Sequence, residues 1–552
     1  MTRNNAWVPT GKSAHVDTFT IDNLPPKDLW PRLDFSQLPQ LREYPGQINA
    51  ANGLLDDHVS AGRGDRTAIL FGDLRWTYAD LKSHADRIAR VLVEDAGLVP
   101  GNRVLLRGPN NPMMAAAWFA VIKAGGVCVA TMPLLRAREL THIIDKAQIT
   151  HALCDEILAE AMAEARTRTS SLTSIMHFSA AGDGGADLDS AIAARPDGFD
   201  NVDTAADDPA LIAFTSGTTG APKGTIHFHR DVLAMCDCFP TAPFGVHEDD
   251  IFTGTPPLAF TFGLGAMLGF PLRAGASVAL IDRPSPEALF ETIRRHRCTA
   301  LFTAPVMFRT LTERVGEGDL SSLTHAVSAG EHLPKPIFEM FEKATGLRII
   351  DGLGSTEMIH IFVSTAGDDI RPGATGKAIP GYEACILDDD GNPLPPGQQG
   401  HLAVRGPTGC RYLDDVERQR SYVTGDGWNR PGDIYEMDED GYFWYGARAD
   451  DMIISAGYNI AGPEVEVALL DHPKVRECAV VGVPDAERGN IVKAFVVLTD
   501  PEDASDATVK ALQDFVKGEI APYKYPRAIE FVDALPRTET GKVQRFKLRE
   551  DR

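Results

Sequence analysis

At 552 residues, the chain is long enough for about three to four compact domains of ordinary size. Its composition, 43% hydrophobic and 24% charged, is that of a globular protein and excludes a disordered or fibrous one. With 54 basic and 77 acidic side chains the net charge is −23, so nucleic acid and anionic membrane surfaces would be repelled. We therefore expect no nucleic-acid and no membrane partner, while a small anionic substrate remains open because local cations act at short range.

The eight cysteines are scattered singly, apart from Cys236 and Cys238, whose spacing fits neither a zinc site nor a redox pair. This usage favours a reducing compartment. The segment 1–16 is polar and has no apolar stretch typical of a secretory signal. The uncharged stretch 251–272 is long enough to span a bilayer, but its prolines and glycines favour buried loops and turns. We expect a soluble, cytoplasmic protein.

The first part of the chain alternates predicted helices with short apolar strands. A helical period begins after the N-cap Thr77, and a second helix starts at a proline and ends before Gly125. The same rhythm returns after residue 276, and it predicts parallel sheets covered by helices. The expected helices are 78–93, 112–123, 286–296 and 305–315, and the expected strands are 103–107, 126–130, 277–281, 300–303 and 325–328.

After about residue 370 the pattern changes to short strands, such as 384–388 and 401–405, separated by turns rich in glycine and proline. A polar bridge, 448–452, leads into a last unit with helices at 463–470 and 506–519 and strands at 477–483, 492–498 and 528–532. We predict an α/β fold. Its large N-terminal domain, 1–449, has parallel αβ-layered sheets and a β-rich subdomain over about 370–447, and an α+β C-terminal domain follows at 450–552.

One segment points directly to chemistry. The apolar strand 211–214 runs into Thr215-Ser-Gly-Thr-Thr-Gly-Ala-Pro-Lys-Gly224. Glycines let backbone N–H groups approach phosphate oxygens, hydroxyls add donors and Lys223 supplies a cation. The spacing is not that of a Walker A loop. A polar surface turn rich in glycine is the alternative interpretation.

The segment 215–224 resembles the phosphate-loop signature of the adenylate-forming enzymes, which include acyl- and aryl-CoA synthetases, luciferases and the adenylation domains of peptide synthetases. Further motifs that resemble this superfamily follow in the expected order over most of the chain. They are Ser328-Ala-Gly-Glu-His-Leu-Pro334, Asp351-Gly-Leu-Gly-Ser-Thr-Glu357, Gly432-Asp433, Arg448 and Pro536-Arg-Thr-Glu-Thr-Gly-Lys542.

The resemblance implies that ATP, with Mg²⁺, activates a carboxylate. Attack of the carboxylate on the α-phosphorus brings two anions together, so cations and N–H donors are required. The catalytic residues would be Thr356 at the α-phosphate, Glu357 as the Mg²⁺ ligand and Lys542 between the carboxylate and the α-phosphate. The implied ATP- and AMP-binding residues are Thr215, Ser216, Gly217, Thr218, Thr219, Gly220, Lys223, Gly330, Glu331, Asp351, Gly352, Leu353, Gly354, Ser355, Asp433 and Arg448.

The ribose-binding aspartate has a local rival, because Thr424-Gly-Asp426 matches the family's usual Thr-Gly-Asp more literally than Pro431-Gly-Asp433 does. We choose Asp433 for its distance from Arg448. Two departures from the family pattern, Pro431 in place of threonine and Ala447 in place of glycine, concern local loop geometry and not the reaction.

The resemblance also implies a second step, in which coenzyme A takes the acyl group. The family rotates its C-terminal domain between the two steps, which makes the domain at 450–552 a mobile one. Asp450 matches the hinge residue, and Gly457 would leave room for the pantetheine arm in the CoA channel. Aromatic Phe260 matches a ring position thought to gate thiol access, with plain core packing as the alternative.

The acyl pocket implied by the resemblance is lined by Phe260, Phe262, Leu264, Ala304 and His360. Thr261 stands where amino-acid-activating domains commonly carry an aspartate, which counts against an α-amino acid. The segment 351–362 is similar to benzoate-CoA ligases, and segments 449–466 and 223–230 are similar to the 2-aminobenzoate-CoA ligase branch. His360 is a candidate polar contact with the ring or a structural histidine.

Other functions stay open at this point. The substrate, a small aryl or acyl carboxylate, includes medium-chain acids as an alternative, and the acceptor thiol includes that of a carrier protein. A hydrolase is disfavoured because segment 326–330 lacks the first glycine of Gly-x-Ser-x-Gly. A non-catalytic nucleotide-binding protein is disfavoured by the presence of Lys542 and Glu357. The protein is expected to be a monomer or a homodimer.

Overall fold

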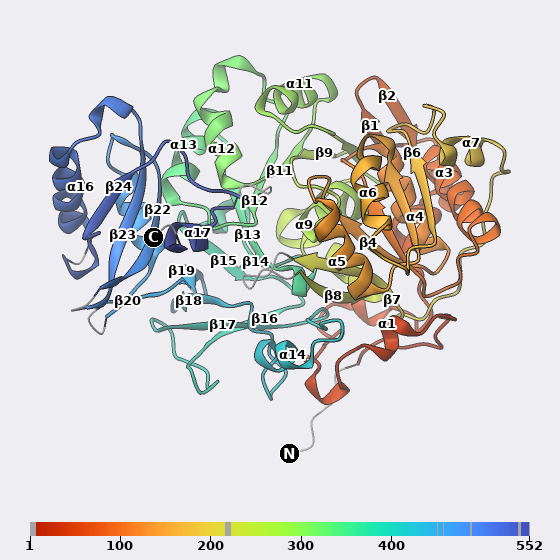
Figure 1. Ribbon diagram of the computed structural model, residues 1–552, viewed down its shortest axis with the longest axis horizontal. Coiled ribbons are helices and arrows are strands. Elements are labelled where there is room, and N and C mark those ends of the chain that lie inside the picture. Colours follow the sequence, from red (N-terminus) through yellow and green to blue (C-terminus); the bar gives the residue numbers. More distant parts are fainter. Residues whose placement is uncertain are drawn as a thin grey trace.

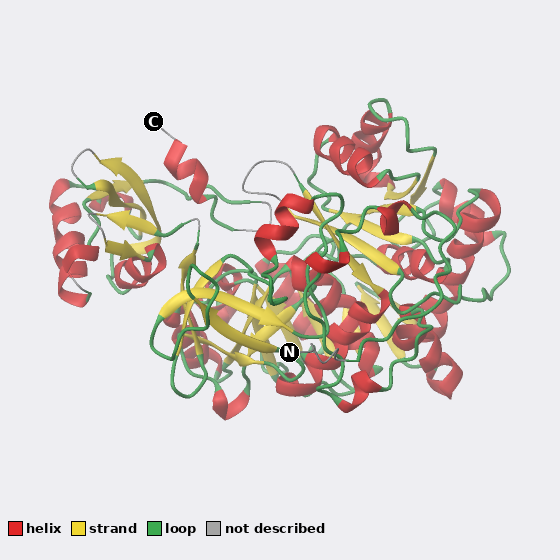
Figure 2. Ribbon diagram, turned by 90° about the horizontal axis from the view of Figure 1, so that it is seen from below, coloured by secondary structure: helices red, strands yellow, loops and turns green. Residues whose placement is uncertain are grey.

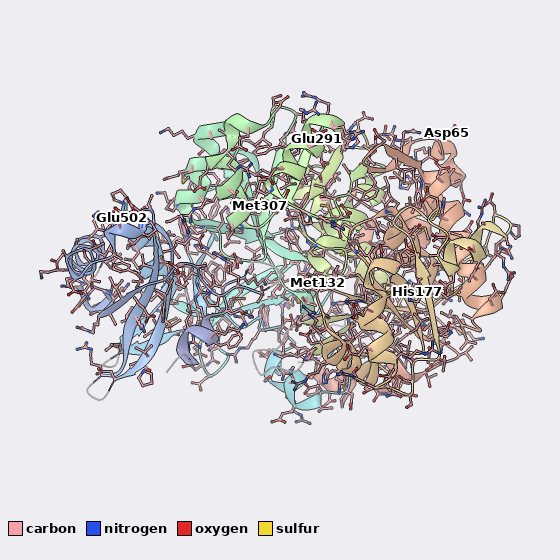
Figure 3. All side chains as sticks on the ribbon, turned by 45° about the horizontal axis from the view of Figure 1, so that its top comes forward. Asp65, Met132, His177, Glu291, Met307 and Glu502 are labelled. Carbon is pink, nitrogen blue, oxygen red and sulfur yellow. The ribbon has the colours of Figure 1, made fainter. Side chains whose placement is uncertain are left out.

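The computed structural model describes residues 7–215, 222–449, 451–455, 458–485, 488–520, 522–538 and 542–550. Its described strands form two large sheets and two small ones. The C-terminal part, blue in Figure 1, lies at one end of the long axis, and most of residues 60–200, orange to yellow, lie toward the other. Glu502 labels the first of these parts in Figure 3 and His177 the second.

The six-stranded sheet has the order β6-β5-β3-β4-β7-β8. Five of its strands are parallel, and β8 returns antiparallel to β7. The strands are β3 (Arg103–Arg107), β4 (Val127–Thr131), β5 (His151–Asp155), β6 (Ser174–Phe178), β7 (Pro209–Thr215) and β8 (Lys223–Phe228). Thr215 and Lys223, which flank the Gly-rich segment in the sequence, therefore pair at the end of the β7–β8 hairpin.

The second sheet has thirteen strands in the order β16-β17-β18-β19-β15-β14-β13-β12-β11-β9-β10-β1-β2. Its centre is parallel from β13 to β1. The strands are β1 (Thr67–Phe71), β2 (Leu74–Thr77), β9 (Ile251–Gly254), β10 (Ser277–Ala279), β11 (Ala300–Thr303), β12 (His325–Ala329), β13 (Ile349–Gly354), β14 (Ile361–Ser364), β15 (Ala374–Ala378), β16 (Glu383–Leu387), β17 (Gln399–Arg405), β18 (Asp433–Met437) and β19 (Phe443–Arg448).

The predicted β-rich region is thus hydrogen-bonded into the large sheet. Strand β14 pairs with β13 on one side and with β15 on the other, and β15 pairs with β19. The change of sequence pattern near residue 370 marks the change from parallel to antiparallel pairing. The antiparallel strands and the parallel centre therefore form one continuous support.

Helices cover both sheets, as the alternating pattern predicts. All twelve residues of α4 are buried, and Asn111 caps its first turn just before Pro112. The larger helices of this part are α3 (Tyr78–Arg90), α4 (Pro112–Lys123), α5 (Ala137–Ala147), α6 (Ala159–Arg166), α7 (Asp187–Ala193), α8 (His229–Cys238), α11 (Pro286–His296), α12 (Pro305–Glu313), α13 (Lys335–Thr345) and α14 (Val416–Tyr422). The short helices are α1 (Phe19–Asp22), α2 (Pro39–Arg42), α9 (Thr261–Leu264) and α10 (Phe270–Ala274).

The C-terminal part has its own sheet, β22-β23-β24, and stands apart from the rest in Figure 2. Two apolar clusters, both drawn from residues after 452, lie on its two faces. Its elements are β20 (Ile453–Ser455), β21 (Tyr458–Ile460), α15 (Gly462–Leu470), β22 (Val475–Asp485), β23 (Gly489–Leu498), α16 (Asp506–Glu519), β24 (Ala528–Phe531) and α17 (Arg545–Glu550). The predicted fold, a large α/β part followed by a small α+β part, is confirmed.

The interpretation of 251–272 as loops and turns is wrong. The segment contains β9 and then α9, a π-helical turn (Gly265–Gly269) and α10 in direct succession. The glycines allow close packing: a Cβ on Gly263 would lie 1.9 Å from the Pro257 carbonyl oxygen. Pro271 lies in the first turn of α10, where its missing N–H costs little.

No helix of the described residues is both long and apolar enough to cross a membrane. All eight cysteines lie in the described residues and are free thiols, most of them buried.

Candidate active site

The candidate site lies where the carboxyl ends of β12 and β13 meet the β7–β8 hairpin. Thr215 ends β7 directly opposite Lys223, the first residue of β8. The predicted loop residues between them, Ser216, Gly217, Thr218, Thr219 and Gly220, lie outside the described residues. Because parallel strands end at one edge of a sheet, the segments after β12 and β13 are brought to the same place.

Lys223 is half-buried among charges of both signs. Burial and the neighbouring Arg418 guanidinium lower its pKa, and the Glu357 carboxylate partly offsets this shift. Arg448 and Asp415 contribute further, weaker fields. Cations from three separate segments therefore act on one region, in a chain whose net charge is strongly negative.

The Ser355–Glu357 segment forms a tight turn after β13. Ser355 caps a 3₁₀-helix (Thr356–Met358) by accepting a hydrogen bond from the Met358 N–H. Ile359, buried and β-branched, then takes φ 68° and ψ −39°. This conformation is a strained one for such a residue. The turn thereby holds Thr356 and Glu357 half-buried beside Lys223.

Two tyrosines contact this turn, and the sequence analysis did not single them out. The Tyr412 hydroxyl donates a hydrogen bond to Glu357 Oε1 at 2.7 Å. The Tyr422 hydroxyl lies 3.3 Å from Ser355 Oγ. No local motif predicts this contact, because the tyrosines lie more than fifty residues from the turn in the sequence.

The Thr356 backbone is held from the opposite side by a buried histidine. His227 Nε2 lies 2.8 Å from the Thr356 carbonyl oxygen, so this nitrogen carries the proton and donates it. Burial lowers the pKa of His227 to about 4, which keeps the ring neutral. Asp231 lies beyond it and accepts a hydrogen bond from Arg411 at 2.8 Å. The hydrogen bond from His227 on β8 therefore holds the turn, and Asp231 of α8 lies 3.9 Å from the other ring nitrogen.

The segment Asp351–Gly354 closes the site on the β13 side. Asp351 is buried, and burial raises the pKa of its carboxyl well above the ordinary range. The glycines permit a close approach of β14: a Cβ on Gly352 would lie 2.4 Å from Ile361 Cδ1, and one on Gly354 2.6 Å from the His360 carbonyl oxygen. Leu353 and Gly354 remain half-exposed toward the site.

Asp433 and Arg448 face one another on β18 and β19. Arg448 Nη1 donates to Asp433 Oδ1 at 3.2 Å and to the Pro431 carbonyl at 3.0 Å. The rival Asp426 is exposed and lies in a turn closed by the Gly427 N–H and the Thr424 carbonyl. Of the two departures from the family pattern, Pro431 thus supplies an acceptor for Arg448, and Ala447 is an ordinary buried strand residue.

Lys542 reaches the site from the C-terminal part. Its Cε lies 4.0 Å from the position that a Cβ on Gly330 would take. The Lys542 side chain is still exposed to solvent. Partial desolvation by the surrounding protein lowers the pKa of its ammonium, while the carboxylates of Glu331, Asp433 and Glu357 act in the opposite direction. Burial in turn raises the pKa of Glu331, although Arg537 and Lys542 lie nearby. The structure thus brings residues 330, 357, 433 and 542 together.

The two other predicted residues of the C-terminal part are not placed. Asp450 and Gly457 lie outside the described residues. Among the described residues of this part, Arg549 of α17 forms an ion pair with Asp451, and Arg545 forms a two-pronged one with Glu466 at 2.8 and 2.9 Å.

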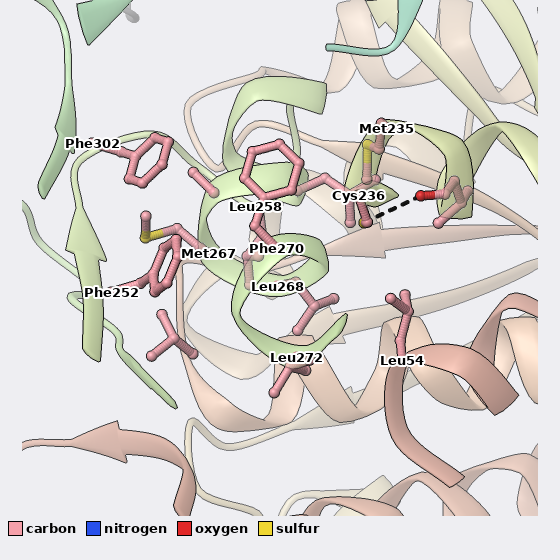
Figure 4. Packing of buried hydrophobic residues seen from close by; sticks show 14 of the residues in the cluster. Leu54, Met235, Cys236, Phe252, Leu258, Met267, Leu268, Phe270, Leu272 and Phe302 are labelled. Carbon is pink, nitrogen blue, oxygen red and sulfur yellow. Dashed lines mark hydrogen bonds between the residues drawn. The ribbon is translucent and has the colours of Figure 1, made fainter. Parts of the chain in front are cut away.

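His360 lies in an aromatic surround formed by Phe239, Phe262 and Phe270, with ring-centre distances of 4.4–6.0 Å. Its Nε2 donates to the Phe262 carbonyl at 3.3 Å, and burial lowers its pKa to about 3. Its Nδ1 has no hydrogen-bond partner among the described residues. In Figure 4, Phe270 points from its helix toward the neighbouring strands that carry Phe252 and Phe302.

The predicted pocket residues do not all share one surface. Phe262 contacts Phe302 and His360, whereas Phe260 and Leu264 line a small cavity of about 20 Å³ together with Trp118 and Cys128. Ala304 is half-buried at the start of α12, two residues after Phe302. The structure therefore brings Phe262 and His360 together and places Phe260 and Leu264 on a second surface.

The potential metal ligands of the candidate site are carboxylate oxygens, which suit Mg²⁺ better than a transition metal. The described residues contain no group of three or more His, Cys, Asp or Glu side chains able to hold a metal ion. Mg²⁺ keeps several waters and binds through one or two carboxylates together with substrate phosphates. Glu357, beside the phosphate loop, offers one such carboxylate.

Comparison with known proteins agrees with the motifs found in the sequence. The family model "AMP-binding enzyme" matches residues 56–411, and "AMP-binding enzyme C-terminal domain" matches residues 464–542. The chain belongs to the AMP-binding enzyme family. Within it, the chain is an acid–thiol ligase, and the relation inferred from the sequence motifs is confirmed.

The relatives of this AMP-binding enzyme include aryl-acid ligases. Benzoate–CoA ligase of Thauera aromatica is 35% identical over 523 residues, which cover 94% of this chain and 98% of the relative. The crystal structure of the anthranilate CoA ligase AuaEII, in complex with anthranoyl-AMP, superposes with a TM-score of 0.87 at 32% identity, covering 92% and 98% of the two chains. Mitochondrial acyl-coenzyme A synthetase ACSM3 of Mus musculus is 33% identical, covering 86% and 84%.

The packing around His360 yields a prediction. A Cβ on Gly265 would lie 2.4 Å from His360 Cδ2 and 2.5 Å from its Nε2. Gly265→Ala should therefore displace the imidazole and destabilise the fold by about 1–3 kcal/mol, the usual cost of overpacking. Urea unfolding measures this change.

The matched control is Gly518→Ala in α16, where a Cβ meets nothing within 4 Å. There the substitution should be neutral or stabilising by up to about 1 kcal/mol. Equal stability of the two variants would contradict the packing assigned to His360.

Proposed function

We propose that this AMP-binding enzyme activates an aromatic carboxylic acid with ATP and transfers the acyl group to coenzyme A. The observation that carries the proposal is the position of Lys542 beside Gly330, in the combined field of Glu331, Asp433 and Glu357. A single ammonium from the C-terminal part thus completes a site whose other members come from the large sheet.

In the first step a carboxylate oxygen attacks the α-phosphorus, and the bond from that phosphorus to the bridging oxygen of pyrophosphate breaks. Lys542 lies between the two anions and offsets their repulsion in the transition state. The Thr356 hydroxyl donates to the α-phosphate, and Asp433 accepts hydrogen bonds from the ribose hydroxyls. The products are acyl-AMP and pyrophosphate.

Charge on the leaving pyrophosphate requires a further partner. Glu357 would hold Mg²⁺, which neutralises charge on the polyphosphate when bound. Lys223 and the backbone N–H groups of the loop at 216–220 would contact the outer phosphates. These assignments rest on the motif resemblance, and the closeness of Lys223 to Glu357 supports them.

In the second step the CoA sulfur, having lost its proton, attacks the acyl carbon, and the bond to the AMP oxygen breaks. This step needs Lys542 to give way to the thiol. We propose that the C-terminal part, residues 450–552, turns about Asp450 and that Gly457 then lines the pantetheine path. The support is the motif resemblance, together with apolar clusters in this part that draw only on its own residues.

For the substrate we propose a benzoate-type acid, with 2-aminobenzoate as the leading candidate. The aromatic surround of His360 suits a planar ring. The neutral imidazole keeps one acceptor nitrogen, Nδ1, which would match a donor on the ring such as an amino group. The benzoate and anthranilate ligases among the relatives support the same class.

An aliphatic acid is the second candidate, favoured by the similarity to the acyl-coenzyme A synthetase ACSM3. A third candidate keeps the first step and changes the acceptor, so that a carrier-protein thiol replaces coenzyme A.

Pyrophosphate release over a panel of acids separates these candidates. With ATP and Mg²⁺, we expect release with 2-aminobenzoate or benzoate, and a thioester only when coenzyme A is present. Faster release with medium-chain fatty acids would overturn the aryl assignment. Pyrophosphate release without any CoA thioester, in an assay that also offers a carrier-protein thiol, would overturn the assignment of coenzyme A as the acceptor.

The role of Lys542 is tested by measuring the two steps of the reaction separately. Lys542→Ala should slow acyl-AMP formation by roughly 10²–10³, the scale for losing one donor to a transition state. Thioester formation from supplied acyl-AMP should largely survive. Lys547→Ala, which removes an exposed lysine nearby, is the control. An equal loss in both steps would refute the role.

The pH dependence of the first step gives a separate prediction. Lys542 must be charged, and partial desolvation by the surrounding protein lowers its pKa below the ordinary lysine value of 10.5. Acyl-AMP formation should therefore fall as pH rises through this lowered pKa, earlier than a fully hydrated lysine would cause. Lys542→Arg keeps its charge, so the activity that it retains should lack this alkaline decline. Persistence of the same decline in the arginine variant would assign it to another group.

A further inference from the structure

A pair of tyrosines lies against the turn that carries Glu357. Tyr412 contacts Glu357 and Tyr422 contacts Ser355, so the two hydroxyls bracket Thr356. Their rings meet edge to face, with centres 5.7 Å apart and an interplanar angle of 89°. Tyr412 is 3% exposed and Tyr422 is 8% exposed, so both rings are fixed by their surroundings.

Tyr412 is anchored through its backbone to the strand that begins at Lys223. It forms a bridge with Thr225 of β8, and the adjacent Leu413 N–H donates to the Gly224 carbonyl. Gln419 of α14 accepts from the Tyr412 N–H at 3.0 Å and donates to the Cys410 carbonyl. The hydroxyl of Tyr412 is therefore positioned by the same strand that carries the phosphate-loop lysine.

The chemistry of the contact is one-directional. A phenol carries its proton at neutral pH and a carboxylate carries none, so Tyr412 donates the hydrogen bond and Glu357 accepts it. A hydrogen bond from a neutral donor to a carboxylate is charge-assisted and fixes the acceptor oxygen. With Oε1 held by Tyr412, rotation of the Glu357 carboxyl group is restrained, which favours one direction for Oε2.

We propose that Tyr412 is a positioning residue that holds Glu357 in the orientation needed to receive the metal ion of Mg·ATP. Tyr422 supports the turn through Ser355. The inference rests on the proposed function, because it concerns the carboxylate assigned there to Mg²⁺. It adds that the metal-binding geometry of residue 357 is set by a hydroxyl from the segment after β17 and not by the 3₁₀ turn alone.

The test measures binding, so that catalysis need not occur. An ATP analogue with a methylene between the α- and β-phosphorus cannot release pyrophosphate, and calorimetry at increasing Mg²⁺ gives its affinity and the Mg²⁺ midpoint. Tyr412→Phe removes only the hydroxyl. It should raise the Mg²⁺ midpoint by roughly tenfold to a hundredfold, the range for losing a hydrogen bond to a charged group.

Two further variants make the result specific. Tyr442→Phe is the matched control, because it deletes a buried hydroxyl that donates at 2.8 Å to the Asp369 carbonyl, away from the turn. Its midpoint should equal that of the wild type. In the Glu357→Gln background, Tyr412→Phe should cause no additional shift, because the carboxylate that Tyr412 would position for the metal ion is already absent.

An unchanged Mg²⁺ midpoint in Tyr412→Phe would overturn the inference, and so would an equal shift in the Glu357→Gln background. If Tyr412→Phe does not fold, Glu357→Asp makes the same test. Shortening the side chain withdraws the carboxylate from the hydroxyl while keeping its charge, so an unchanged midpoint there also overturns the inference. Failure of the wild type to bind the analogue with Mg²⁺ would instead refute the proposed function itself.

Discussion

Repulsion between anions is the constraint around which this site is built. A carboxylate and a triphosphate must meet in a chain with a net charge of −23. The structure gathers the cationic side chains of Lys223, Arg448 and Lys542 at the site, where the Arg448 charge lowers the pKa of both lysines. Because such fields act over short distances at physiological salt, the acidic remainder of the surface does not cancel them.

The large sheet gives these charges a common frame. The segments after β12 and β13, and the Asp433–Arg448 pair on β18 and β19, belong to one hydrogen-bonded sheet. Lys542 alone among the catalytic candidates comes from the C-terminal part. In this arrangement the residues proposed to bind the nucleotide belong to the large sheet, whereas the lysine proposed to promote the reaction belongs to the C-terminal part. Movement of that lysine would leave the nucleotide-binding residues in place.

Local signals predicted much of the fold. Helix α3 begins after the N-cap Thr77, whose side chain accepts from the Asp80 N–H, and α4 begins at Pro112, both as the sequence predicts. The prediction of loops and turns for segment 251–272 failed because glycine and proline normally interrupt helices and strands. There, tight packing against Pro257 and His360 requires glycine inside helical turns. The union of the β-rich region with the main sheet likewise depends on strand pairing that no local pattern encodes.

The candidate site shows the same division. Residues in continuous motifs, such as Thr356 and Glu357, were accessible to sequence reasoning, whereas Tyr412 and His227 were not, because each meets the turn through a long-range contact.

Ile359 gives the turn a further property. A β-branched residue at φ 68° does not choose this conformation, so the packed surroundings impose it. The local sequence alone does not favour this backbone conformation. Thr356 and Glu357 keep their orientation only while β13 and β14 enclose the turn. The shape of this turn therefore depends on an intact interior, and loosening the packing around Ile359 would release it.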